Sequence, residues 1–131
     1  MRRTLRRRSR QLLAIVAAAA LAACDNPFSS DGESLIRLKN ASTFELTSVT
    51  FAPGTPRLEF PRIAPGATTD YAGVQGAYRY GYLDALVGGE RRVIQPIDYV
   101  GERVIGEGRF TYVITIDAAT RNPSVSMVRD D

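Results

Sequence analysis

The sequence has no histidine, no tryptophan and only one cysteine, Cys24. Without histidine the chain can form neither a triad that uses an imidazole base nor a histidine metal site. A single cysteine excludes an intramolecular disulfide. These absences remove the commonest routes to hydrolytic and metal chemistry. We therefore expect a protein that is not an enzyme and that carries no cofactor and no catalytic metal.

Positive charge is concentrated at the N-terminus. Six arginines lie within residues 2–10, whereas all 14 acidic residues follow Cys24. Residues 24–131 number 108 and hold eleven basic and fourteen acidic side chains, a net charge of −3. This balance argues against a nucleic-acid partner, which requires a basic surface. The length is sufficient for one domain with a single core.

An uncharged segment, residues 11–23, follows the arginine block and leads into Leu21-Ala22-Ala23-Cys24. About a dozen apolar residues give roughly 18–20 Å of helix, which is too short for a bilayer core of about 30 Å. A basic start, a short apolar run and small residues before a cleavage point are typical of a secretory signal peptide.

The first 24 residues resemble the signal peptide and lipobox of bacterial lipoproteins. The resemblance implies that residues 1–23 are removed, that Cys24 is lipidated with acyl chains such as palmitate, and that the protein is exported and membrane-anchored. Asp25 resembles a signal for retention at the inner membrane. The alternatives are an ordinary cleaved signal with a chance cysteine, an uncleaved membrane helix, or a twin-arginine signal at Arg2-Arg3.

Residues 24–33 are polar and rich in turn-forming side chains, which predicts a flexible tether. Their acidic and amide side chains lack the spacing of a calcium-binding loop, so we expect no metal there. From residue 34 to residue 129 apolar side chains recur with a period of two. Seven or eight short strands separated by turns predict an all-β domain, an antiparallel β-sandwich of immunoglobulin or transthyretin type. A true immunoglobulin domain is unsupported, because a cysteine pair and a tryptophan are missing.

Local signals refine this prediction. In the expected strand 44–51, a bulge near Thr47-Ser48 would bring the apolar side chains on both sides of it into the core. Gly88-Gly89 predicts a two-residue hairpin turn that pairs residues 82–87 with 90–95. Pro61 is expected to end a strand that starts at residue 58, and Pro96 to mark an edge strand or its end. Further strands are expected at 35–39, 68–74, 78–87, 109–117 and from 125, before a frayed end at 130–131.

Most of the domain also resembles a group of small, uncharacterised bacterial lipoproteins with β-sandwich domains. The segments that carry the resemblance are residues 36–42 (IRLKNAS), 76–80 (GAYRY), 95–102 (QPIDYVGE) and 108–112 (GRFTY). The resemblance implies the fold and attaches no activity to it.

Two features are candidate contact surfaces. Tyr78, Tyr80 and Tyr82 alternate along an expected strand and would present three rings on one face, a surface on which sugars and peptides stack. The other interpretation is that these rings form the core face, which the small residues opposite them favour. Asp98 and Tyr99 lie in an expected loop, where binding residues concentrate. The same loop could instead cover the end of the domain, with Ile97 and Val100 as plugs.

Catalysis by paired carboxylates is the remaining enzymatic possibility. Asp98, Glu102 and Glu107 lie near one another in the sequence, but a domain of this size seldom forms a cleft that would shift one carboxyl pKa. We therefore expect a cell-envelope lipoprotein that acts as a structural or protein-interaction module, with another envelope protein as a further partner. A carbohydrate- or peptide-binding module that uses the tyrosine face or the Asp98-Tyr99 loop is the alternative.

Overall fold

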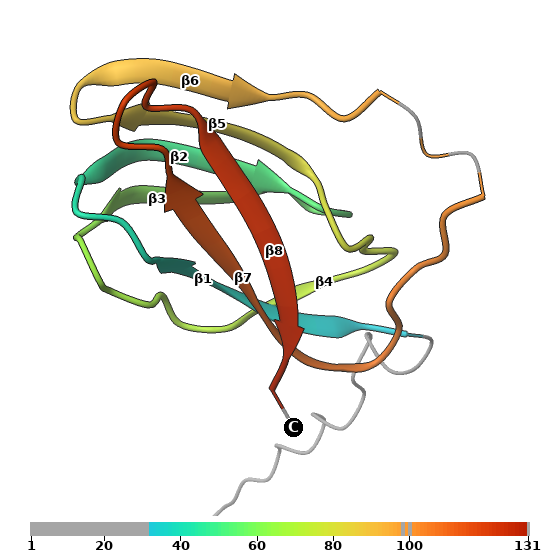
Figure 1. Cartoon of the computed structure of the whole chain (residues 1–131). Helices are drawn as coiled ribbons and strands as arrows, with labels where there is room; N and C mark the ends of the chain where they lie inside the picture. Colours follow the sequence, from blue (N-terminus) through green and yellow to red (C-terminus); the bar gives the residue numbers. More distant parts are fainter. Residues whose placement is uncertain (1–31, 98, 100, 131) are drawn as a thin grey trace, which may run out of the picture.

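The computed structural model describes residues 32–97, 99 and 101–130. The expected signal peptide, Cys24, most of the tether, Asp98, Val100 and Asp131 lie outside the described residues. The described part contains strands and no helix, so the predicted all-β class is confirmed. Within these residues there is accordingly no helix that could cross a membrane. The strands are β1 (Ser34–Asn40), β2 (Leu46–Ala52), β3 (Leu58–Ile63), β4 (Ala72–Val74), β5 (Tyr82–Val87), β6 (Glu90–Ile94), β7 (Gly108–Ile116) and β8 (Pro123–Arg129) (Figure 1).

The strands form two four-stranded sheets, with the orders β4-β1-β7-β8 and β3-β2-β5-β6. All neighbours are antiparallel except β1 and β7, which run parallel from the pair Ser34 and Gly108 to the pair Asn40 and Ile114. The expectation of a purely antiparallel arrangement was therefore wrong. A period of two reports which face of a strand is buried, but it carries no information on the direction of the neighbouring strand.

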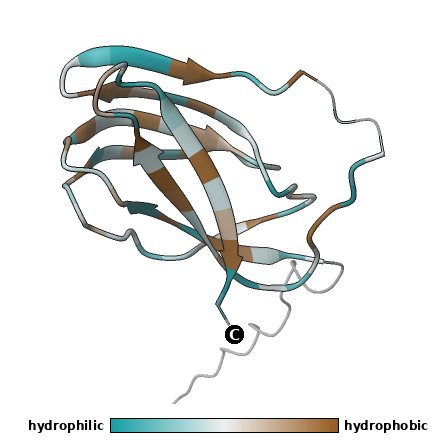
Figure 2. Ribbon diagram, viewed as in Figure 1, coloured by the Kyte–Doolittle hydropathy of each residue, from teal (hydrophilic) through white to brown (hydrophobic). Residues whose placement is uncertain are grey.

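The two sheets share one apolar core. Phe51 of β2 and Tyr112 of β7 come from different sheets, and their rings meet edge to face with centroids 4.9 Å apart. Apolar and polar residues alternate along most strands (Figure 2). Burying each large core side chain contributes about 1.5–3 kcal/mol. The buried apolar residues are Ile36, Leu38, Leu46, Val49, Phe51, Leu58, Ile63, Val74, Ala77, Leu83, Ala85, Val87, Phe110, Tyr112 and Ile114.

The predicted bulge in β2 is confirmed. The pairing of β2 with β5 shifts register between Thr47 and Thr50, and Ser48 has a φ of 48°. The extra residue lets Leu46, Val49 and Phe51 all face the core. Pro61 does not end β3 as expected, because β3 is an edge strand and Pro61 lies opposite the bulge, where the ladder requires no donor.

The β5–β6 hairpin forms as predicted. Gly88 and Gly89 have φ values of 57° and 95°, and the strands pair from Val87 and Glu90 to Leu83 and Ile94. β6 is an edge strand that ends before Pro96. Two other strands are shorter than expected: the segment 68–74 is a strand only at Ala72–Val74, and the segment 78–87 becomes one only at Tyr82.

Asn40, at the end of β1, is fully buried and fully hydrogen-bonded. Its Nδ2 donates to the carbonyl oxygens of Phe44 (2.8 Å), Ile63 (3.0 Å) and Ala64 (3.2 Å). Its Oδ1 accepts from the backbone N–H (3.0 Å) and the hydroxyl (2.7 Å) of Ser42. One amide thus joins β1, the turn that follows it and the end of β3. The sequence suggested only a turn at this point.

The end of the chain is held at Asp130, contrary to the expected fraying. Its carboxylate accepts hydrogen bonds from the hydroxyls of Tyr71 (2.6 Å) and Thr111 (2.7 Å), and Arg37 Nε lies 3.6 Å away. Burial raises the pKa of Asp130, but these hydrogen bonds and the arginine charge outweigh it, so the pKa lies below its ordinary value. The hydrogen bond from the Tyr71 hydroxyl to Asp130 also raises the pKa of Tyr71.

Candidate functional site

Three tyrosines from two loops pack together at one end of the domain. The ring centroids of Tyr78 and Tyr99 are 5.0 Å apart and those of Tyr80 and Tyr99 are 5.2 Å apart, both in tilted arrangements. Tyr78 and Tyr80 are nearly parallel, with centroids 6.4 Å apart. Tyr78 and Tyr80 precede β5, whereas Tyr99 belongs to the long connection between β6 and β7. We call these three residues the tyrosine cluster.

The backbone beneath the tyrosine cluster is fixed to the core. The N–H of Tyr78 donates to the carbonyl of Pro53 (3.0 Å), and the hydroxyl of Tyr112 donates to the carbonyl of Tyr78. The Tyr112 ring is fully buried, and burial raises the pKa of its hydroxyl, which stays a donor across the physiological range. A core side chain therefore sets the position of the tyrosine cluster.

Close backbone packing explains why a glycine follows Tyr80. A Cβ on Gly81 would lie 2.6 Å from Pro53 Cα and 2.7 Å from the carbonyl oxygen of Ala52. A side chain at this position would therefore push the segment away from the end of β2. The second loop is attached to the same segment, because the N–H of Ile105 donates to the carbonyl of Ala77 (2.8 Å). Both loops of the tyrosine cluster are thus held by backbone contacts.

Two adjoining hollows extend from the tyrosine cluster along β8. Their volumes are about 330 Å³ and 450 Å³, and they share Arg79 and Met127. Because β8 is an edge strand, its inward-facing Val125 and Met127 are only partly covered. The remaining residues of the smaller hollow are Tyr80 and Ser126, and those of the larger are Gly101, Glu102, Arg103, Val104, Ile105, Phe110 and Arg129.

The charges around the two hollows are mainly positive. Arg79, Arg103 and Arg129 line them against a single acid, Glu102. Arg129 lies with its guanidinium 5.1 Å from the centroid of the Phe110 ring, so it covers part of the apolar floor while keeping its charge. Together the two hollows, which we call the β8 groove, combine an apolar floor with a basic rim.

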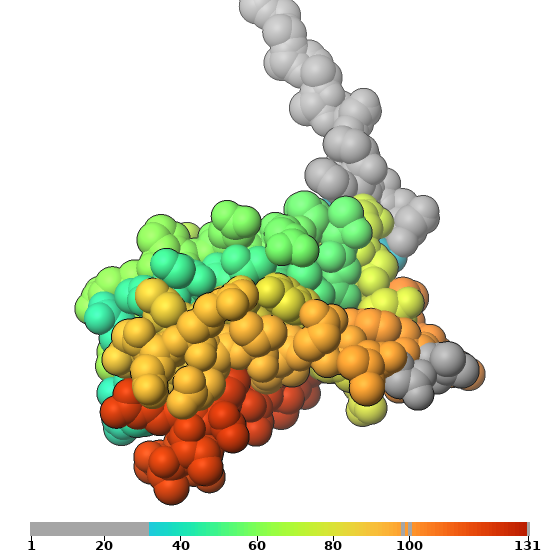
Figure 3. Space-filling model, turned by 90° about the horizontal axis from the view of Figure 1, so that it is seen from above, coloured from blue at the N-terminus to red at the C-terminus, as the bar shows by residue number. Residues whose placement is uncertain are grey.

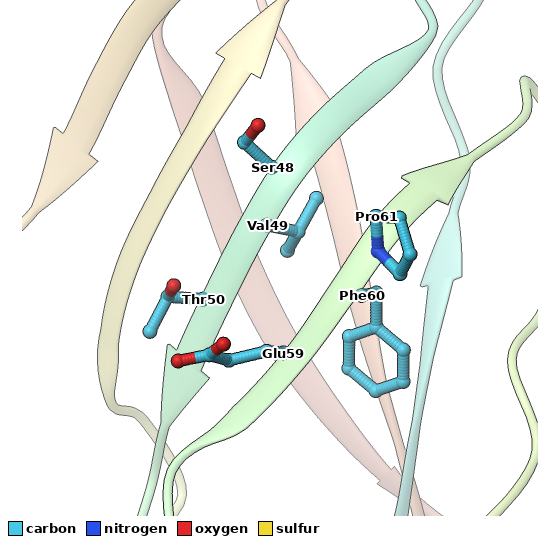
Figure 4. A pocket seen from close by; sticks show the side chains of 6 residues that line it. All are labelled: Ser48, Val49, Thr50, Glu59, Phe60 and Pro61. Carbon is cyan, nitrogen blue, oxygen red and sulfur yellow. The ribbon is translucent and has the colours of Figure 1, made fainter.

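A third hollow, of about 360 Å³, lies at the β2 bulge (Figure 4). It is lined by Ser48, Val49, Thr50, Glu59, Phe60 and Pro61. The bulge of β2 and the proline opposite it open this space between β2 and β3. It is a consequence of the strand irregularity, and it brings together no set of groups that would perform chemistry. In the described part of the chain, no three metal-ligating side chains converge.

The structure separates the residues that the sequence grouped. Tyr78 and Tyr80 lie in a loop, whereas Tyr82 starts β5, where its hydroxyl donates to Asp84 (3.0 Å) and Arg57 lies over its ring at 5.7 Å from the centroid. The core face of β5 consists of Leu83, Ala85 and Val87, so the interpretation of the tyrosines as the core face was wrong.

The second candidate region is only partly described. Tyr99 joins the tyrosine cluster and is 37% exposed, whereas Asp98 lies outside the described residues. Ile97 is 89% exposed, so it does not plug the end of the domain as one interpretation expected. Sequence reasoning missed the contribution of β8. The sequence predicts only a last strand from residue 125, and the signal that Val125 and Met127 line a groove, their place on an edge strand, depends on strand order.

No protein-family model and no curated protein sequence matches this chain. Among solved structures, it is similar to an NMR structure of a protein from Eubacterium rectale. The TM-score is 0.54 and the sequence identity is 14%, with 76% of this chain and 92% of the other covered. At that identity the similarity concerns the fold alone.

Proposed function

We propose that the protein is an exported bacterial lipoprotein anchored through acyl chains on Cys24, with its β-domain in the cell envelope. The observation that carries the proposal is the order of an arginine-rich start, a short apolar segment and Leu21-Ala22-Ala23-Cys24. Two or more acyl chains give stable anchorage, which one chain alone does not. Asp25 favours the inner membrane as the location.

Substitution of the cysteine tests the anchor. Cys24→Ser should abolish labelling by radioactive palmitate and move the protein from the membrane fraction to the soluble fraction of the envelope. Ser30→Ala, in the same tether, should leave both unchanged. Retention of Cys24→Ser on membranes with no change would contradict the proposal and favour an uncleaved membrane helix.

We further propose that the two sheets form a β-sandwich of immunoglobulin or transthyretin type that acts without catalysis, as a protein-interaction module. The partner is an extended, acidic and apolar segment of another envelope protein. Support comes from the β8 groove, which runs along an edge strand and has an apolar floor and three arginines. An edge strand can pair with an added strand, and pockets beside it select side chains.

A carbohydrate ligand is less well supported. Sugars stack on exposed aromatic faces, but the three rings of the tyrosine cluster pack against one another at 5.0–6.4 Å between centroids. Faces occupied by neighbouring rings offer less area to a sugar. The tyrosine cluster therefore fits a role as part of the wall of the β8 groove, which Tyr80 lines, better than a role as a platform on which sugars stack.

Photo-crosslinking from β8 tests the partner. A photoreactive side chain at Ser126, which lines the groove, should give an adduct of defined mass in intact cells. The same group at Ser124, on the same strand but outside the groove lining, should not. The additional substitution Met127→Lys should abolish the Ser126 adduct while the protein remains folded. Equal adducts from both positions, or none from membrane-attached protein, would contradict an interaction at the groove.

A further inference from the structure

The connection between β6 and β7 exposes apolar side chains at one end of the domain. Ile97 is 89% exposed and Val104 is 54% exposed, with Tyr99 at 37% between them in the sequence. We call these three residues the apolar tip. The connection projects from the body of the domain, as the orange segment of Figures 1 and 3 shows. Other exposed apolar residues of the described part, such as Val93 and Val128, lie singly on strands.

The parallel pairing of β1 with β7 places the last residues of this connection beside the point where the chain enters the domain. The first residues of the two strands, Ser34 and Gly108, are partners in the register. The hydroxyl of Ser34 also donates to the carbonyl of Gly106. The connection therefore returns to the core at the start of β1 (Figure 1). The β7–β8 turn lies at the other end of β7, about 27 Å away at about 3.3–3.4 Å per residue.

The length of chain before β1 limits how far this end can lie from a membrane. Ten residue steps separate Cys24 from Ser34. A flexible chain of that length has a typical end-to-end distance of about 17–19 Å and a limit of about 36 Å. A lipid on Cys24 thus keeps the entry end of the domain, where the connection that carries the apolar tip returns to β7, at a high effective concentration next to the bilayer.

We propose that the apolar tip inserts into the bilayer interface and holds the domain with its entry end against the membrane. This inference rests on the lipid anchor proposed above. Aliphatic side chains and tyrosine suit the interface, where one part of a side chain is apolar and another is wet. Arg103, next to Val104, can extend its charged end to the lipid phosphates.

The charges favour an apolar contact over an electrostatic one. Arg103 is accompanied by three acids in the same connection, Asp98, Glu102 and Glu107, so the region has no polybasic character. Contact should therefore occur on vesicles of zwitterionic lipid and should persist in high salt. The larger hollow of the β8 groove shares Arg103 and Val104 with this region, so a domain held in this way leaves accessible mainly the smaller hollow, which Val125 and Ser126 line.

A unique thiol makes the inference testable in the full-length, lipidated protein. Because Cys24 is the only cysteine and its sulfur carries the lipid, Ile97→Cys provides the one reactive thiol. An environment-sensitive fluorophore is attached there and the protein is reconstituted into phosphatidylcholine vesicles that contain a nitroxide-labelled lipid. Ala119→Cys, in the exposed β7–β8 turn, is the matched control. The label at position 97 should be blue-shifted and quenched several-fold more than the label at position 119.

Further outcomes separate this inference from the proposal on which it rests. Adding Val104→Ser to Ile97→Cys should reduce the quenching at position 97 by half or more without releasing the protein from vesicles. Equal quenching at positions 97 and 119 in protein that floats with vesicles would overturn the inference and leave the anchor intact. Quenching at position 97 only after membrane proteins are added would also overturn it, because the tip would then contact a protein. Failure to float would refute the anchor itself.

Discussion

Replacement of Asn40 by alanine tests the idea that one buried amide joins three parts of the chain. The substitution removes the donor of three hydrogen bonds to main-chain carbonyls. The hydrogen bond to the carbonyl of Ile63 is buried. Leaving this carbonyl without a donor lowers the free energy of unfolding by about 1–3 kcal/mol. The bonds to Phe44 and Ala64 are part-buried, so water can replace them in part, at about 0.5–1.5 kcal/mol each. We expect a loss of about 3 kcal/mol.

Urea unfolding followed by circular dichroism measures this loss. With an m-value of about 1–3 kcal/mol/M, the midpoint should fall by about 1–3 M. Ser42→Ala is the comparison variant, because it leaves the three carbonyl contacts in place and removes a hydroxyl that donates to Asn40 Oδ1 and accepts from the N–H of Phe44. The loss of these two part-buried hydrogen bonds should cost about 1–2 kcal/mol. A loss below about 1 kcal/mol for Asn40→Ala, with an unchanged m-value, would show that the carbonyls are hydrated and would refute the reasoning.

Asn40→Asp tests the direction in which stability changes with pH. A carboxylate in place of the amide would face three carbonyl oxygens, so its pKa in the folded state must rise above the unfolded value of about 3.9. A group with a raised folded pKa is best tolerated when protonated. The variant should therefore be most stable, relative to the parent protein, at low pH, and should lose stability as the pH rises through that folded pKa. A difference that does not vary between pH 4 and pH 8 would contradict this.

Two further predictions concern the loops and the surface of β5. Gly81→Ala should lower the thermal midpoint and displace the tyrosine cluster, which near-ultraviolet circular dichroism reports. Gly73→Ala should be tolerated, because the Cβ there would meet only the flexible end of Glu33; equal effects would contradict the role of close backbone packing. The hydrogen bonds from Arg91 lower the pKa of Asp84, so its contribution is present above about pH 4 and is lost as the pH falls through the folded pKa. Asp84→Asn should thus destabilise the protein at pH 7 by up to about 1 kcal/mol and by less at pH 2, and equal losses at the two pH values would refute the assignment.

Local signals in the sequence predicted local structure well. Gly88-Gly89, between two apolar segments, predicts a tight turn, and the hairpin forms there. The change of alternation between Leu46 and Val49 required one extra residue, and the bulge lies at Ser48. In both places the information is contained in fewer than ten residues, so strand order and tertiary contacts do not alter the outcome.

The tyrosines were harder to interpret because residues 78–87 carry apolar or aromatic side chains on both faces. Which face is buried depends on the side chains of the opposing sheet, which lie far away in the sequence. The position of Tyr99 against Tyr78 depends on the path of the β6–β7 connection, and the groove along Met127 depends on β8 being an edge strand. The sequence therefore indicated the residue types of the site but not their grouping. The segment proposed as a lipobox is different, because its pattern is contiguous in the sequence.

The parallel pairing of β1 with β7 also affects the order in which the chain can fold. Ser34 and Gly108 are 74 positions apart, so one edge of β1 has no partner until most of the chain has been synthesised. Contacts this distant in the sequence slow folding, because a large loop must close before they form. The sheet that contains β1 is therefore completed only when the last two strands, β7 and β8, are available. That delay is compatible with the export proposed above, in which the chain crosses a membrane before it folds.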